Sequence, residues 1–171
     1  MPDPLMYINK YYLVLNALEV ITDHLKQQIE QMNIRLQTGT ENIHWETVVE
    51  ILREAGMASH TPDMHERAFK NSYTVAFAFD ENVLVGFGRA ISDGEYQAAI
   101  YDVAVLPAYQ GKGIGNMIVQ AILKNTPDCN FILYASPGKE AFYEKSHFKR
   151  MKTGMALFVD GKRMQEKGFT E

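Results

Sequence analysis

Cysteine is almost absent from this sequence, and long apolar runs are absent altogether. Cys129 is the only cysteine among 171 residues, which excludes an internal disulfide and agrees with a reducing compartment. We expect this single thiol to serve in packing. No apolar run approaches the roughly 18 residues that a membrane-spanning helix needs. The N-terminus places Asp3 and Pro4 before an amphipathic stretch, unlike a secretory signal. These absences predict a cytoplasmic protein with no membrane partner.

Strong charge of either sign is also lacking. The net charge of −4 does not suggest the concentrated basic surface that phosphate backbones require, so no nucleic acid partner is predicted. A modest negative charge slightly favours a cationic substrate, but it agrees equally well with a role in solubility. The hydrophobic share of 46% and charged share of 22% indicate one globular core. No metal site is predicted, because the early acidic residues and histidine lack ligand spacing: Asp3, Glu19, Asp23, His24 and Glu30.

The first 32 residues have the pattern of a long amphipathic helix. Apolar side chains recur at helical intervals from Ile8 to Met32. We expect this helix, residues 1–32, to stand apart from a domain that spans residues 33–171. It either covers the domain's own core or pairs with another subunit, and the second alternative predicts a homodimer.

The rest of the chain mixes strand and helix patterns without repeats or low-complexity linkers. Three antiparallel strands joined by short turns, the last of them the central strand, precede a glycine-rich loop and a helix, which indicates a mixed α+β fold. The expected strands are 33–36, 73–79, 83–90, 98–105, 130–135 and 155–159, and the expected helices are 45–56, 64–70, 114–125 and 139–146.

The most informative stretch runs from Ala98 to Asn125. A β-branched strand ends at Pro107, and an amphipathic helix begins at Ile114. Between them, three glycines in Gln110–Gly115 let the backbone turn sharply and approach a ligand closely. Because the first N–H groups of a helix have no intrahelical partner, an anion such as a phosphate can bind there. The spacing fits neither the P-loop nor the dinucleotide fingerprint.

Two motifs resemble those of the GNAT superfamily of N-acetyltransferases. Gln-x-x-Gly-x-Gly in Gln110–Gly115 follows Asp-Val-Ala-Val-x-Pro in Asp102–Pro107, as in the family's acyl-CoA-binding motif. Downstream, Ala141–Phe148 is similar to the family's Ala-Phe-Tyr-x-x-x-Gly-Phe signature, with His147 in place of the usual glycine. The resemblance implies a mostly antiparallel central sheet flanked by helices, and transfer of acetyl from acetyl-CoA to a primary amine.

The resemblance also implies how the chain holds acetyl-CoA. The central strand and the next one splay apart, and pantetheine lies in the gap. The N–H of Val103 would point at the thioester carbonyl, and Val105 would pair with pantetheine. The pyrophosphate would lie on Gln110, Gly111, Lys112, Gly113, Ile114 and Gly115, and the remaining residues expected at the cofactor are Ala104, Ser136, Phe142 and Lys145.

For catalysis, the resemblance places Tyr143 as the general acid that protonates the departing thiolate. Related enzymes carry a Glu or His base at positions that correspond here to Ala99 and Tyr101. Ala99 cannot serve, whereas the Tyr101 hydroxyl could order a water. Strand alternation places Asp102 on the opposite face, in a structural role. The base stays open among residues of the preceding helices: Glu46, Glu50, His60 and His65.

Two alternatives remain open from the sequence. The acceptor is either a small-molecule amine, such as a polyamine or an aralkylamine, or a protein amine. Because Ala99 and Tyr101 supply no ordinary base, a second interpretation is an acyl-CoA-binding sensor or scaffold without catalytic activity.

Overall fold

The computed structural model describes residues 33–126 and 128–171. The helix predicted over 1–32, and its separation from the domain, lie outside the described residues. Five strands form one sheet in the order β1-β2-β3-β4-β5, antiparallel except for the parallel β4–β5 pair. The elements are β1 Ile34–Gln37, α2 Trp45–Glu54, α3 Pro62–Lys70, β2 Thr74–Asp80, β3 Val83–Ser92, β4 Gln97–Val105, the short 3-10 turn η1 Pro107–Tyr109, α4 Ile114–Asn125, β5 Asn130–Ile132, α5 Glu140–Glu144 and α6 Gly161–Glu166. The predicted α+β sheet is confirmed.

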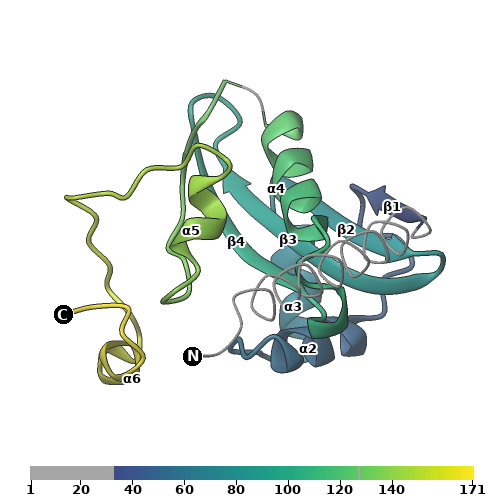
Figure 1. The fold of residues 1–171 in the computed structure, drawn as a ribbon, viewed down its shortest axis with the longest axis horizontal. Helices are drawn as coiled ribbons and strands as arrows, with labels where there is room; N and C mark the ends of the chain where they lie inside the picture. Colours follow the sequence, from purple (N-terminus) through teal and green to yellow (C-terminus); the bar gives the residue numbers. More distant parts are fainter. Residues whose placement is uncertain (1–32, 127) are drawn as a thin grey trace, which may run out of the picture.

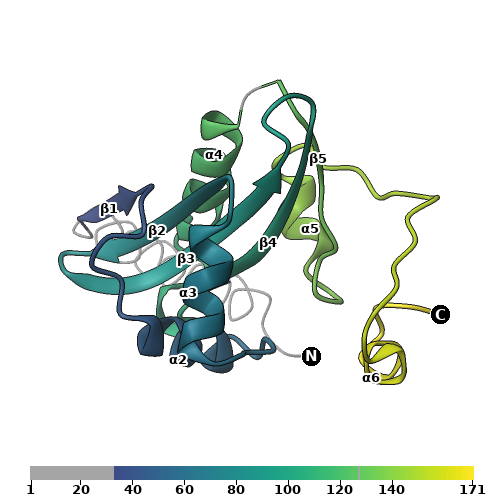
Figure 2. The same cartoon turned by 180° about the vertical axis from the view of Figure 1, so that it is seen from behind.

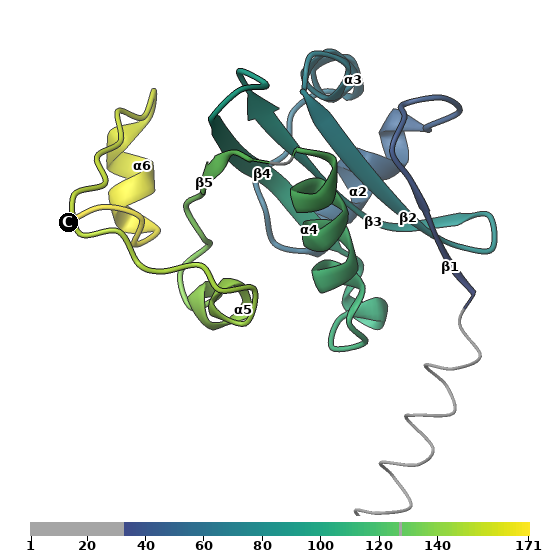
Figure 3. The ribbon, with the colours of Figure 1, turned by 90° about the horizontal axis from the view of Figure 1, so that it is seen from above.

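Helices cover both faces of the sheet (Figures 1 and 3). Helices α2 and α3 lie on one face and α4 on the other. The first face packs on an aromatic cluster of Trp45, Phe69, Phe77 and Phe87, with neighbouring ring centroids 5.3–6.2 Å apart. The α4 face packs on aliphatic side chains that include Ile114, Ile118 and Ile122. Because β2 and β3 are buried from both sides, the sheet is a rigid support for the end of β4.

Strand β4 contains a β-bulge at Asp102. Phe87 pairs with Ala104 and Arg89 pairs with Tyr101, so Gly88 faces two residues of β4. Asp102 has a φ of +53°, in the left-handed region, as the extra residue of a bulge can. A bulge bends its strand and breaks the alternation of side chains between faces.

The chain after β5 differs from the sequence prediction. Strand β5 ends at Ile132 rather than Ala135, and the predicted strand Met155–Val159 is wrong, because the segment has no neighbouring strand within residues 33–126 and 128–171. Helix α6, which begins where the Asp160 carboxylate accepts from the Arg163 N–H at 3.0 Å, was not predicted. No helix of the described residues is long and apolar enough to cross a bilayer.

His147 occupies a backbone conformation that favours glycine. Its φ is +67°, and it follows the C-terminal end of α5, where the Phe148 N–H donates to the Tyr143 carbonyl at 3.2 Å. A left-handed residue at this place ends many helices and is usually glycine. The turn therefore keeps the conformation expected of the family's glycine despite the histidine.

We predict that His147→Gly raises the free energy of unfolding by about 0.5–1 kcal/mol, because glycine relieves the left-handed strain of an L-residue. Urea denaturation would measure the change. Lys149→Gly is a control at an exposed position with ordinary φ, where glycine only adds flexibility to the unfolded chain and should not stabilise. A destabilised His147→Gly would contradict the assignment of strain.

One histidine lies inside the α3 face of the core. His65 is 4% exposed, and its Nε2 accepts a hydrogen bond from the His60 main-chain N–H at 2.9 Å. Burial lowers the pKa of His65 from its ordinary 6.5, and it outweighs the opposing effect of the Asp102 carboxylate. The ring is therefore neutral at pH 7, with its proton on Nδ1.

This lowered pKa predicts a pH-dependent stability. Below the unfolded pKa of about 6.5, the unfolded chain binds a proton that the folded chain resists, so stability is complete above that pH and falls as the pH drops through it. Denaturation by urea at about pH 7.5 and about pH 5.5 should show a larger loss for the wild type than for His65→Gln. Replacing the exposed His44 by Gln should leave the wild-type loss unchanged. Equal losses in wild type and His65→Gln would refute this prediction.

Candidate active site

The glycine loop is open where a ligand would approach it. Gly111 and Gly113 have φ values of +77° and +85°, and a Cβ added at either position would meet no atom within 4 Å. The first main-chain bond of α4 runs from the Met117 N–H to the Gly113 carbonyl at 3.0 Å. The N–H groups of residues 114–116 therefore precede the intrahelical bonds and face an open loop. This arrangement suits an anion.

Side chains hold the loop in place from both sides. The Gln110 Nε2 donates to the Val105 carbonyl at 2.9 Å, which ties the loop to the end of β4. The Tyr109 hydroxyl donates to the Asp80 carboxylate at 3.0 Å, which ties it to the β2–β3 hairpin. That hydrogen bond raises the pKa of Tyr109, and the Lys112 ammonium lies 5.1 Å from the centre of the Tyr109 ring. Neither Tyr109 nor Asp80 was singled out from the sequence.

Beside the loop, the edge of β4 that faces β5 has no strand partner beyond Ala99 among the described residues. The two strands pair only from Gln97 to Ala99, opposite Asn130–Ile132. Beyond this point the chain after β5 leads away from β4 (Figure 2). Val103 packs on the α4 face, and the Ala104 and Val105 side chains are buried on opposite faces of the sheet. Their main chain, rather than their side chains, is what these residues can offer a ligand.

Helix α5 is packed against the first turn of α4. The Phe142 ring lies 3.1 Å from where a Cβ on Gly115 would be, so the third loop glycine is what permits this close approach. The Ser146 hydroxyl donates to the Asn116 side-chain carbonyl at 3.1 Å. These contacts hold Tyr143, on the same helix, near the glycine loop.

Tyr143 is half-buried between aromatic neighbours. Its ring centroid lies 4.8 Å from that of Phe142 and 6.0 Å from that of Phe148. Burial raises the pKa of Tyr143 above its ordinary 10, so the phenol is protonated at neutral pH. The other two residues expected at the cofactor lie at either end of this helix: Ser136 is in the turn before it, and the exposed Lys145 caps it.

The bulge corrects the predicted placement of Asp102. Its carboxylate accepts from the Arg89 Nε at 2.6 Å, and the same guanidinium lies 5.4 Å from the centre of the Tyr101 ring. Asp102 and Tyr101 therefore share contacts on the face of α3, instead of pointing to opposite faces. Strand alternation failed here because the bulge inserts one residue. Nothing in the sequence pointed to Arg89.

Tyr101 also contacts the chain that follows β5. Its ring centroid is 5.9 Å from that of Tyr134, and the two rings are nearly perpendicular. Ala99 and Ile132 are the last two residues that pair β4 with β5. Tyr101 follows Ala99 by two positions, and Tyr134 follows Ile132 by two. The two tyrosines thus lie where the strands stop pairing.

The candidate bases lie in different environments. The neutral His65 already uses its Nε2 lone pair to accept from His60, so it cannot take up a proton without losing that bond. Glu46, Glu50 and His60 are exposed.

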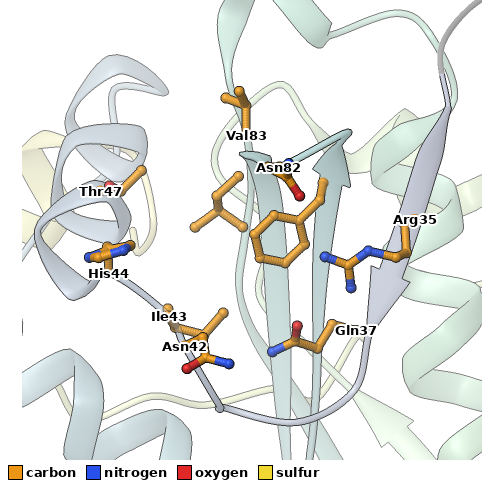
Figure 4. Close-up of a pocket in the computed structure, with 10 residues that line it drawn as sticks. Arg35, Gln37, Asn42, Ile43, His44, Thr47, Asn82 and Val83 are labelled. Carbon is orange, nitrogen blue, oxygen red and sulfur yellow. The ribbon is translucent and has the colours of Figure 1, made fainter.

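The pocket in Figure 4 is not formed by the glycine loop, the end of β4 or α5. It has a volume of about 400 Å³ and is formed by β1, the start of α2 and the β2–β3 hairpin, with Arg35, His44 and Asn82 among its residues. None of the predicted site residues lines it. Within residues 33–126 and 128–171, no three His, Cys, Asp or Glu side chains gather as metal ligands would.

This geometry agrees with the known proteins that the chain resembles. The N-acetyltransferase ycf52 of Pyropia yezoensis, an uncharacterized protein, is 27% identical over 75% of this chain and 78% of its own length. The ycf52 protein of Gracilaria tenuistipitata var. liui is 39% identical, but that match spans 47% of this chain and 48% of that protein.

Solved structures show the same fold. A probable acetyltransferase from Staphylococcus aureus is 25% identical, with a TM-score of 0.66 over 74% of this chain and 98% of that one. A GNAT family protein from Streptococcus pneumoniae is 26% identical, with a TM-score of 0.64 over 73% and 97%. The model of the Acetyltransferase (GNAT) family matches residues 40–148, which is more than half of the sequence. The chain therefore belongs to the GNAT family of acetyltransferases.

Proposed function

We propose that this protein transfers acetyl from acetyl-CoA to a primary amine by direct attack. The observation that carries the proposal is the convergence of three features at one end of the sheet. These are the open glycine loop before α4, the unpaired edge of β4, and a protonated tyrosine on a helix packed against α4. The glycine loop suits the anionic pyrophosphate of acetyl-CoA, and the unpaired strand edge suits the amides of its pantetheine arm. The tyrosine suits the sulfur that leaves the thioester.

The residues that fit acetyl-CoA are mostly main-chain groups. The N–H groups of Ile114 and Gly115, and the glycines ahead of them, suit the pyrophosphate, because no Cβ fills the space at Gly111 or Gly113. The free edge of β4 at Val103 suits the pantetheine amides and the thioester carbonyl. A preorganised N–H aimed at a developing oxyanion is worth about 3 kcal/mol in acyl transfer.

Tyr143 is proposed as the general acid. As the amine nitrogen bonds to the acetyl carbon and the carbon–sulfur bond breaks, the phenol gives its proton to the departing sulfur, and the proton that the nitrogen loses on becoming an amide restores the phenol. Its raised pKa keeps that proton available at pH 7. The amine itself must arrive neutral, and an alkylammonium of pKa about 10.4 is neutral in only about one molecule in 2,500 at pH 7. We propose that a water held by the Tyr101 hydroxyl removes the proton to solvent.

An arylalkylamine is the acceptor that we propose. The faces of Tyr101 and Tyr134, with Tyr134 53% exposed, border the place where the strands stop pairing and suit an aromatic body. The rice protein named serotonin N-acetyltransferase 2 is 37% identical over 34% of this chain. A protein amine is the alternative, since the soybean protein named histone acetyltransferase TAP1 is 31% identical over 48% of this chain.

A turnover assay tests whether Tyr143 is the general acid. In a thiol-release assay over a panel of arylalkylamines, polyamines and lysine peptides, Tyr143→Phe should lower turnover about tenfold or more, with little change in acetyl-CoA affinity. Tyr96→Phe, at an exposed tyrosine before β4, is the matched control and should keep full turnover. Unchanged turnover in Tyr143→Phe would reject the acid assignment. Tight CoA binding by the wild type, with no thiol release across the panel, would favour the sensor.

Calorimetric titration with CoA tests whether the glycine loop binds the pyrophosphate. Gly113→Asp places a carboxylate beside the expected pyrophosphate and should weaken binding by about tenfold or more. Because φ at Gly113 is +85°, any side chain strains the backbone, so Gly113→Asn is the matched control that carries the strain without the charge. The Asp variant should bind more weakly than the Asn variant. Undiminished affinity in Gly113→Asp would overturn the loop assignment.

A further inference from the structure

The pocket in Figure 4 has the size and surface of a site for a second ligand. Its volume of about 400 Å³ lies within the range of small-molecule sites, and it combines apolar and polar side chains as they do. Strand β1, the start of α2 and the β2–β3 hairpin form its walls (Figure 4). None of its residues is assigned to acetyl-CoA, to the acceptor or to the proposed acid.

Buried apolar side chains form the floor of this pocket. Ile43, Phe79 and Leu84 are buried, and each still turns part of its surface toward the pocket. The side chains at the rim, which include Asn42 and Asn82, are exposed and polar. A ligand with an apolar body therefore leaves water when it covers the floor, and this transfer favours binding.

The charge that faces the pocket is of one sign. Among the described residues that line it, Arg35 is the only Lys or Arg, and there is no Asp or Glu. The Arg35 guanidinium lies over the Phe79 ring, 4.7 Å from its centre. No described carboxylate forms a salt bridge with it. A guanidinium that rests on a ring keeps the N–H groups of its edge, and their fork matches the two oxygens of a carboxylate.

The start of α2 lies across the pocket from Arg35 (Figure 4). The His44 side chain does not cap this helix, and the first main-chain bond runs from the Thr47 N–H to the His44 carbonyl at 3.1 Å. The N–H groups of residues 45 and 46 therefore precede the intrahelical bonds, and the positive end of the helix dipole is on the pocket's side. Glu46, in the same turn, does not line the pocket.

We infer that this pocket binds a small carboxylate that has an apolar body and no ammonium group. The carboxylate pairs with the Arg35 guanidinium, and the body covers the buried floor. An ammonium would face Arg35 with no carboxylate on the pocket wall to pair with it, which disfavours amines and amino acids. Because the residues proposed for acetyl-CoA do not line this pocket, both ligands can be bound at once.

Three probes with the same body test which headgroup the pocket prefers: 3-phenylpropionate, 3-phenylpropanamide and 3-phenylpropylamine. Each is titrated to about 10 mM into the full chain and followed by NMR, since ligands of this size bind weakly. We expect 3-phenylpropionate to bind about fivefold more tightly than 3-phenylpropanamide, because its hydrogen bonds to Arg35 are charge-assisted. Its signals should map to residues 35–47 and 79–84.

Three results of the titrations would overturn the inference. The first is the absence of 3-phenylpropionate binding, and the second is an equal or greater affinity of these residues for either of the other two probes. The third is displacement of 3-phenylpropionate by saturating CoA, or shifts confined to the glycine loop and β4, because the carboxylate would then occupy the acetyl-CoA site. Failure of CoA itself to bind would reject the proposed function and leave this result readable.

Arg35→Gln tests the cation. We expect it to weaken 3-phenylpropionate binding by about fivefold and to leave 3-phenylpropanamide binding unchanged, because only the charged headgroup loses its partner. Arg53→Gln is the matched control, since it makes the same change at an exposed arginine in the last turn of α2, outside the pocket. Thermal unfolding checks that both variants fold. An Arg35→Gln protein that keeps the wild-type preference for the carboxylate would refute the assignment.

Discussion

The separation of β4 from β5 is the constraint on which the site depends. Two parallel strands that stayed paired over their whole length would satisfy each other's main-chain groups and leave none for a ligand. Here the pairing stops at Ala99, and the bulge at Asp102 bends β4 just beyond that point. The Arg89 guanidinium holds the Asp102 carboxylate at 2.6 Å and thereby ties the bulge to β3. Strands β2 and β3, which are buried on both faces, keep this opening in place.

The opening also explains why glycine is needed where it is. Gly111 and Gly113 supply the backbone conformations of the loop, whereas Gly115 has an ordinary φ and is required for a different reason. The Phe142 ring occupies the space of its missing side chain, and so brings α5 and Tyr143 to the start of α4. One short motif thus sets both the open glycine loop and the position of the proposed acid.

Much of this arrangement could be predicted from the sequence. The glycine loop, the strand before it and the helix after it follow from local patterns, and the order β2-β3-β4 follows from the short turns between these three strands. The placement of Asp102 could not be predicted, since one inserted residue reverses every later side chain and leaves no clear mark in the sequence. Arg89 is likewise one charged residue in a strand until its partner across the sheet is known. The strand expected at Met155–Val159 has the correct pattern, but pairing is not a local property.

The bond between the Tyr109 hydroxyl and the Asp80 carboxylate has a consequence for how the loop meets its ligand. Together with the Gln110 side chain on the Val105 carbonyl, it fixes both flanks of the loop before anything binds. A loop that is already ordered loses little conformational entropy on association, so more of its interaction energy appears as affinity. The β2–β3 hairpin that carries Asp80 is distant in sequence from the glycines, yet its hydrogen bond to Tyr109 orders the loop before a ligand arrives.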